Sequence, residues 1–144
     1  MSRIEWFAGL YLNDEKTKII VPRQCILATI ISGAKKHKSG PMAKAGVFMN
    51  NDPELDFADK NVEIEKLWSD MSDKYVSRAR VKIGQSAIMR TRPIFTKWNL
   101  DVSIVLDEDI VPVQEFKEWV KTGGKSVGLC DWRPQHGRFD VEFI

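Results

Sequence analysis

The stretch between Lys74 and Trp98 carries many basic side chains and no acidic ones. Within it, Arg78, Arg80 and Lys82 alternate with small or apolar residues. A β-strand would place all three side chains on one face, because successive side chains of a strand point to opposite sides. Neighbouring like charges repel one another, and an anionic partner relieves that repulsion. Phosphate is the usual partner, so the pattern indicates nucleic-acid binding.

The same basic stretch has a purely structural alternative. The preceding segment, Asp52 to Asp73, is rich in carboxylates, and pairing between the two stretches would neutralise much of the basic charge. Both interpretations stay open at this point. On the first interpretation, the residues expected to hold phosphates are Arg78, Arg80, Lys82, Arg90 and Arg92.

A second group of basic residues surrounds the sequence Ser39-Gly40-Pro41, with Lys38 before it and Lys44 after it. Backbone amides and ammonium groups converge on phosphates in loops of this composition. The alternative is that basic residues complement the dipole at a helix C-terminus. That alternative explains Lys35 and Lys36 better than the two outer lysines.

A third candidate is the segment from Gly128 to Phe139, which combines glycine, arginine, histidine and one tryptophan. Here Trp132 would stack on a base, while Arg133 and Arg138 would contact phosphate or sugar. The structural alternative is a loop in which Trp132 covers the core and Asp131 pairs with Arg133.

We expect no enzyme activity, no cofactor and no metal site. The segment Thr122 to Ser126 resembles the end of a phosphate-binding P-loop, but Trp119 stands where the first glycine is required. A Cys130 and His136 nucleophile pair has no evident third group to orient it. The cysteines and histidines are too scattered for a zinc module: Cys25, His37, Cys130 and His136.

Residue periodicity predicts the elements that position these side chains. Helical spacing predicts four helices: Ser2 to Leu12, Arg23 to Lys36, a short one carrying Ile64, Leu67 and Trp68, and one from Pro112 to Gly123-Gly124. Alternation predicts single strands at Lys18 to Val21, Gly46 to Met49, Trp98 to Leu106 and Phe139 to Phe143.

A hairpin is predicted where Tyr75 to Ile83 and Ala87 to Thr91 flank a Gly84-Gln85 turn. Ser39-Gly40-Pro41 predicts a break, and Asp107 to Asp109 predict a turn before the last helix. The order of elements suits an α+β fold with a ferredoxin-like or RRM-like antiparallel sheet and helices on one face.

The bulk properties are those of one domain spanning residues 1–144. A chain of 144 residues, 43% of them hydrophobic, can bury a core without disulfides. The two cysteines are expected to be reduced thiols. No secretory signal or long apolar segment is evident, so we expect a cytoplasmic protein without membrane contact, in the host cytoplasm if a phage encodes it.

Several motifs resemble a recurring bacteriophage protein family. They are Ile20-Val21-Pro22, Ile88 to Phe95 followed by Trp98, and Gly128 to Pro134 followed by Gly137 to Phe139. The likeness covers most of the chain. That family in turn resembles the RAMP superfamily, the RRM-like subunits that line guide RNA in CRISPR effectors.

The resemblance implies binding of RNA or single-stranded DNA without catalysis, with Gly128 to Gly137 as the glycine-rich loop. The chain departs from the family pattern at Ser2 to Leu12, where an additional N-terminal strand is expected. Its absence would leave a sheet edge that a second copy or another partner chain could complete.

The leading expectation is therefore a non-catalytic, phage-type protein that binds single-stranded nucleic acid through a basic sheet face and the Gly/Arg/Trp loop. The alternative is an anti-CRISPR or other protein-interaction module that docks on, or mimics, a nucleoprotein effector subunit. Its docking surface would comprise Asp52, Glu54, Asp56 and Asp59. A virion-assembly role rests on the phage resemblance alone.

Overall fold

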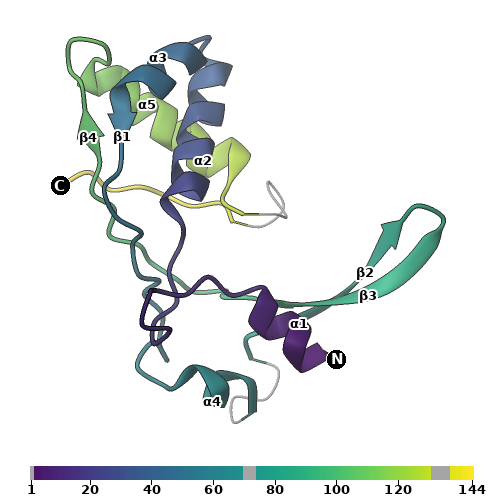
Figure 1. The fold of residues 1–144 in the computed structure, drawn as a ribbon. Coiled ribbons are helices and arrows are strands. Elements are labelled where there is room, and N and C mark those ends of the chain that lie inside the picture. Colours follow the sequence, from purple (N-terminus) through teal and green to yellow (C-terminus); the bar gives the residue numbers. More distant parts are fainter. Residues whose placement is uncertain (1, 70–73, 131–136) are drawn as a thin grey trace. The chain divides into compact units, whose positions relative to one another are not determined.

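The computed structural model of the protein describes residues 2–69, 74–130 and 137–144 (Figure 1). It divides into two compact units, each built from two separate stretches of chain. Unit 1 comprises Met1–Ile20 and Pro53–Asp101, and unit 2 comprises Val21–Asp52 and Val102–Ile144. The α+β class is confirmed, because the described residues form helices and small antiparallel sheets.

Unit 1 is organised around Trp6, whose side chain is completely buried. The Trp6 indole N–H donates a hydrogen bond of 3.0 Å to the backbone carbonyl of Tyr75. The Tyr75 ring in turn lies 5.4 Å, centroid to centroid, from both Phe57 and Phe95. The residue that immediately precedes the hairpin is thus held in an aromatic core. The elements of this unit are α1 (Ser2–Ala8), α4 (Ile64–Ser69), β2 (Val76–Ile83) and β3 (Ser86–Pro93).

The predicted hairpin is confirmed. Strands β2 and β3 pair antiparallel from Val76 opposite Pro93 to Ile83 opposite Ser86. Gly84 begins the turn with a φ of +62°, a conformation that glycine adopts at low cost and that tight hairpin turns require. Figure 1 shows the ribbon leading away from α1, with the turn at its far end.

The long alternating segment from Trp98 to Leu106 was predicted to be one strand, and that prediction is wrong. In unit 1, Asn99 and Asp56 exchange two backbone hydrogen bonds of 2.8 and 2.9 Å. In unit 2, β4 (Val105–Leu106) pairs with β1 (Val47–Phe48). The segment passes from one unit to the other, so its pairing partner changes along its length. The alternation of apolar and polar residues indicates which side chains face a core. It does not indicate that one partner strand runs along the whole segment.

The segment from Lys18 to Val21 was predicted to be a strand, but it forms only isolated β-bridges. Ile19 pairs with Leu12, and Ile20 pairs with Glu54. Pro22 follows directly and has no backbone N–H to extend the ladder.

Unit 2 is a helical layer joined to the small β1–β4 sheet. Helix α2 spans Arg23–Lys36, the predicted bounds, and α5 (Val113–Thr122) packs against it. A Cβ atom at Gly33 would lie 2.3 Å from the Trp119 carbonyl oxygen, so the glycine permits this close approach. The other elements are α3 (Gly40–Gly46) and a π-helical turn, η1 (Gly123–Val127).

Two further predictions for unit 2 need correction. Gly40 and Pro41 begin helix α3 instead of a loop, because proline in the first turn sacrifices no intrahelical hydrogen bond. Residues 139–143 form no strand, although their side chains alternate between half-buried and exposed as predicted. The Phe139 N–H bonds to the Gly124 carbonyl at 3.0 Å, and the Phe143 ring contacts Phe116 on α5.

The sheets formed by the described residues have two strands each, β1–β4 in unit 2 and β2–β3 in unit 1. A ferredoxin-like or RRM-like fold needs one larger sheet covered by helices on one face. The described residues do not form that sheet, because the alternating segments predicted for it pair elsewhere or pack against α5.

The Trp6 hydrogen bond leads to a first prediction. Trp6→Phe removes the indole N–H, leaves the buried Tyr75 carbonyl without a hydrogen-bond donor and opens a small cavity. We therefore expect a loss of about 3 kcal/mol in the free energy of unfolding. Urea denaturation followed by circular dichroism measures the loss. Ile4→Ala, at a position of α1 that is 72% exposed, is the control. A loss of less than about 1 kcal/mol for Trp6→Phe would contradict this role of the indole.

Candidate nucleic-acid interface

The hairpin register assigns the basic side chains to faces. Residues directly opposite each other in an antiparallel pair share a face. Arg80 lies opposite Met89, and Lys82 lies opposite Ala87. We call this side the basic face: Arg78, Arg80, Lys82, Ala87, Met89 and Thr91. The opposite side, near the turn, is the aliphatic face: Val81, Ile83 and Ile88.

Arg80 and Lys82 are the exposed, unpaired cations of the basic face. Both are exposed, and neither has a hydrogen bond or ion pair with any other described residue. Arg78, nearer the root of the hairpin, places its guanidinium 6.0 Å from the centroid of the Trp68 ring. Neutralisation by the acidic stretch is therefore not seen for Arg80 and Lys82, although Asp70 and Asp73 lie outside the described residues.

Arg90 and Arg92 do not share this face. Both alternate onto the other side of the ribbon, where the carboxylate of Glu5 on α1 lies 3.7 Å from Arg90 and 3.3 Å from Arg92. The same Glu5 oxygen accepts the Thr91 backbone N–H at 3.1 Å. The five residues predicted to bind phosphate thus lie on two different faces, and two of them form ion pairs with Glu5 of the same chain.

Sequence reasoning missed the role of Glu5. More than eighty residues separate it from its partners on β3, and no local pattern connects them. The missed consequence is structural: α1 covers the outer edge of β3 at Thr91. Covering an exposed strand edge limits unwanted strand pairing.

The other predicted basic residues belong to unit 2. Lys38 follows α2 with a φ of +61°, and Lys44 lies on the exposed side of α3. Arg138 is exposed in the C-terminal segment. The side chains of these three residues make no ion pair with other described residues. Trp132 and Arg133 lie outside the described residues.

The carboxylates proposed for protein docking mostly have local partners. Asp52 accepts the backbone N–H of Arg23 at 2.8 Å, and Asp56 forms an ion pair of 3.1 Å with Lys60. Asp52 belongs to unit 2, whereas Glu54, Asp56 and Asp59 belong to unit 1. Glu54 is exposed. The four carboxylates are therefore not a row of free charges on one unit.

Asp59 fastens the root of the hairpin. Its carboxylate accepts hydrogen bonds from the Tyr75 hydroxyl and, at 2.9 Å, from the Lys74 ammonium. The Tyr75 hydrogen bond, followed by that of Lys74, lowers the pKa of Asp59 below its ordinary value of 3.8. Burial, followed by the hydrogen bond to Asp59, raises the pKa of Tyr75, and the hydrogen bond to Asp59 raises that of Lys74.

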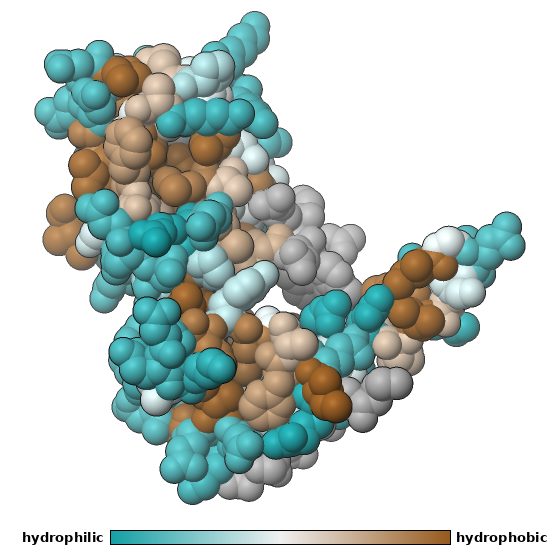
Figure 2. Space-filling model, viewed as in Figure 1, coloured by the Kyte–Doolittle hydropathy of each residue, from teal (hydrophilic) through white to brown (hydrophobic). Residues whose placement is uncertain are grey.

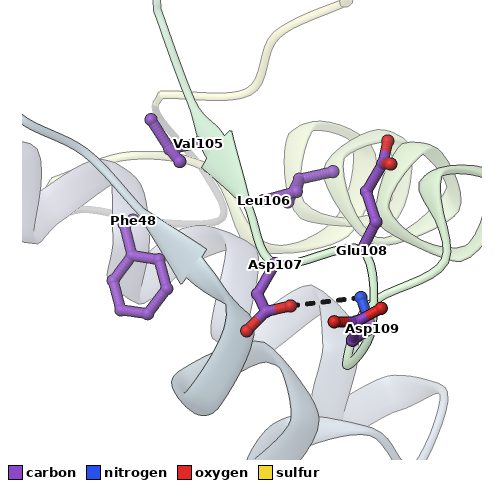
Figure 3. A pocket seen from close by; sticks show the side chains of 6 residues that line it. All are labelled: Phe48, Val105, Leu106, Asp107, Glu108 and Asp109. Atoms are coloured by element: carbon purple, nitrogen blue, oxygen red, sulfur yellow. Dashed lines mark hydrogen bonds between the residues drawn. The ribbon is translucent and has the colours of Figure 1, made fainter.

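An open hollow of about 540 Å³ lies beside β1 and β4 (Figure 3). Phe48 and Val105 line one side, and the turn of Asp107, Glu108 and Asp109 lines the other. The Asp107 carboxylate accepts the Asp109 backbone N–H at 3.1 Å, which confirms the predicted turn. This carboxylate therefore already has a structural use. The described residues contain no group of three or more acidic, histidine or cysteine side chains arranged to hold a metal ion.

Comparison of the chain with protein-family models, curated proteins and solved structures found no match. Across the described part of the chain, no helix has the length and apolar character that a membrane crossing needs. The RAMP-like resemblance therefore stays an expectation, and the local geometry of the hairpin carries the functional argument.

The Asp59 cluster leads to a prediction for acid stability. A lowered pKa means that folding favours the charged carboxylate, so this contribution to stability is present above pH 3.8 and is lost as the pH falls through the lower, folded value. We expect Asp59→Asn to reduce stability at pH 7 and to flatten its decline below about pH 4. Urea denaturation at pH 7 and at several pH values below about 4 measures both effects. Asp101→Asn, at an exposed position of unit 1, is the control. An equally steep decline in Asp59→Asn would contradict the assignment.

Proposed function

We propose that this protein binds nucleic acid without catalysing a reaction, and that the basic face of the β2–β3 hairpin contacts the phosphate backbone. The observation that carries the proposal is the pair of exposed, unpaired cations, Arg80 and Lys82. The ion pairs of Arg90 and Arg92 with Glu5 support the proposal by contrast. Those two arginines have a carboxylate partner within the fold, whereas Arg80 and Lys82 have none among the described residues.

The hairpin holds its cations in a row. Residues two apart on one strand are separated by roughly 6.5 Å, so Arg78, Arg80 and Lys82 form a line along β2 that a phosphate chain can follow. Pairing with β3 fixes this line before any ligand binds. Binding then requires little ordering of the protein, which favours affinity. A larger RRM-like sheet is not needed for this mode.

The ligand class we propose is single-stranded RNA or DNA, which the resemblance of the sequence motifs implies. Strands β2 and β3 contain no aromatic residue, so the hairpin offers phosphate contacts and no platform for base stacking. Its contribution to binding should therefore tolerate any sequence and depend strongly on salt. Stacking would fall to Trp132, outside the described residues.

The rival function, docking through the acidic stretch as an anti-CRISPR or other interaction module, has less support. Asp52, Asp56 and Asp59 each have a partner within their own unit. Each of these pairs would have to open, or be shared, for a basic partner surface to bind.

A titration of fluorescently labelled single-stranded DNA and RNA, read by anisotropy at several salt concentrations, tests the proposal. Each phosphate contact to a single strand steepens the salt dependence by about 0.7 in the log–log slope, so Arg80→Gln with Lys82→Gln should reduce the slope by about 1.4. Arg80→Glu with Lys82→Glu should weaken binding at low salt by at least about tenfold.

The matched control is Lys16→Glu with Lys66→Glu, which changes the net charge equally at exposed positions of the same unit. It should bind within about threefold of the wild-type protein at the same salt concentration. Equal weakening by the two double variants would show that net charge, and not the basic face, determines binding. Absence of binding to either nucleic acid at low salt would overturn the proposal.

A further inference from the structure

We infer that Met89, on the basic face of the hairpin, contacts the bases of a strand whose phosphates follow the cations of β2. The inference rests on the proposed function and deepens it, because it names what the basic face recognises besides negative charge. Met89 is 59% exposed and lies directly opposite Arg80. Figure 2 shows apolar and hydrophilic residues side by side on the outer part of the hairpin.

The basic face consists of two parallel columns of side chains. Its cations all come from β2, and the side chains opposite them on β3 are Thr91, Met89 and Ala87. Cβ atoms of directly opposite residues lie about 5 Å apart. Thr91, at the root, is only 5% exposed, whereas Met89 and Ala87 are exposed. The exposed part of the β3 column is therefore apolar, and it lies immediately beside a line of positive charge.

Met89 and Ala87 differ in size, so the β3 column has a step in height. Alanine covers little of the ribbon backbone, and the longer methionine side chain stands roughly 6.5 Å further along the same face. A flat ring that lies over Ala87 can therefore contact the side of the Met89 chain. Lys82 lies directly opposite Ala87, so a phosphate bound there places its own base within reach of this position.

The combination of a thioether with exposed cations fits a nucleotide. An aliphatic partner would bury Met89 but leave the neighbouring cations without a counter-charge, which costs free energy. A bare polyanion would pair with the cations and leave Met89 in water. A nucleotide carries both a phosphate and an aromatic ring, and methionine sulfur makes favourable contacts with aromatic rings. The three rotatable bonds of methionine let it adapt to different rings, so the contact favours bases in general and not one sequence.

The arrangement of the two strands favours one orientation of the bound bases. With phosphates along β2, bases that point toward β3 lie over Ala87 and Met89, whereas bases that point the other way extend beyond the two-stranded sheet. Contact with an apolar side chain removes part of the ring from water, which favours the first orientation. Strands β2 and β3 contain no aromatic residue, so the thioether supplies a base contact that aromatic rings supply in other strand-binding proteins.

Fluorescence anisotropy of the full chain with two labelled strands of equal length tests the inference. One strand is an oligothymidine, and the other is an abasic strand that keeps only the sugar-phosphate backbone. Met89→Ala should weaken binding of the oligothymidine about threefold to tenfold and leave binding of the abasic strand unchanged. The slope of the salt dependence should stay the same, because the substitution removes no charge. Met89 is exposed, so the variant should keep its fold, which circular dichroism checks.

The matched control is Ile83→Ala, which shortens a 51%-exposed apolar side chain on the opposite side of the ribbon. It should bind both strands as the wild-type protein does, and equal weakening by Ile83→Ala would overturn the inference. Equal weakening of both strands by Met89→Ala would overturn it too, because a structural role does not distinguish a base from its absence.

Failure of this inference is distinguishable from failure of the proposed function. If Met89→Ala binds the oligothymidine as the wild-type protein does, while charge reversal at Arg80 and Lys82 still weakens binding of both strands, the base contact is wrong and the phosphate contact stands. If neither strand binds at low salt, the proposed function fails and the inference fails with it.

Discussion

The hydrogen bond from the Trp6 indole to the Tyr75 carbonyl is the contact on which the hairpin depends. It joins the first helix to the residue that leads into β2, within a core of aromatic rings. A buried carbonyl without a donor costs free energy, so this contact fixes the position at which the ribbon leaves the core. Glu5 on the same helix then binds β3, and Asp59 binds Tyr75. The root is thereby fastened on both strands.

A ribbon fastened at its root separates two kinds of surface. One side carries Arg80 and Lys82, and the other carries Ile83 and Ile88. Both follow from the two-residue period of a strand, and these four side chains are exposed within the part of the chain that the structure describes. We assign the first side to a phosphate backbone.

Short-range patterns predicted local structure well and long-range arrangement poorly. The bounds of α2 and the hairpin turn at Gly84-Gln85 follow from spacing and turn chemistry. The division of residues 98–106 between two units leaves no trace in their alternation. The basic stretch was found from charge alone, but only the register shows Arg90 and Arg92 on the other face. Their partner, Glu5, lies too far away in the sequence for any motif to reveal it.

A methyl NMR titration of the protein with a single-stranded oligonucleotide tests directly whether the basic face of the hairpin binds nucleic acid. Met89 lies on the basic face, directly opposite Arg80, whereas Ile83 and Ile88 lie on the opposite side of the ribbon. Binding on the basic face should shift the Met89 methyl resonance, while the resonances of the two isoleucines should stay in place. Shifts of Ile83 and Ile88 without a shift of Met89 would contradict the central claim that the cation-bearing face of the hairpin binds nucleic acid.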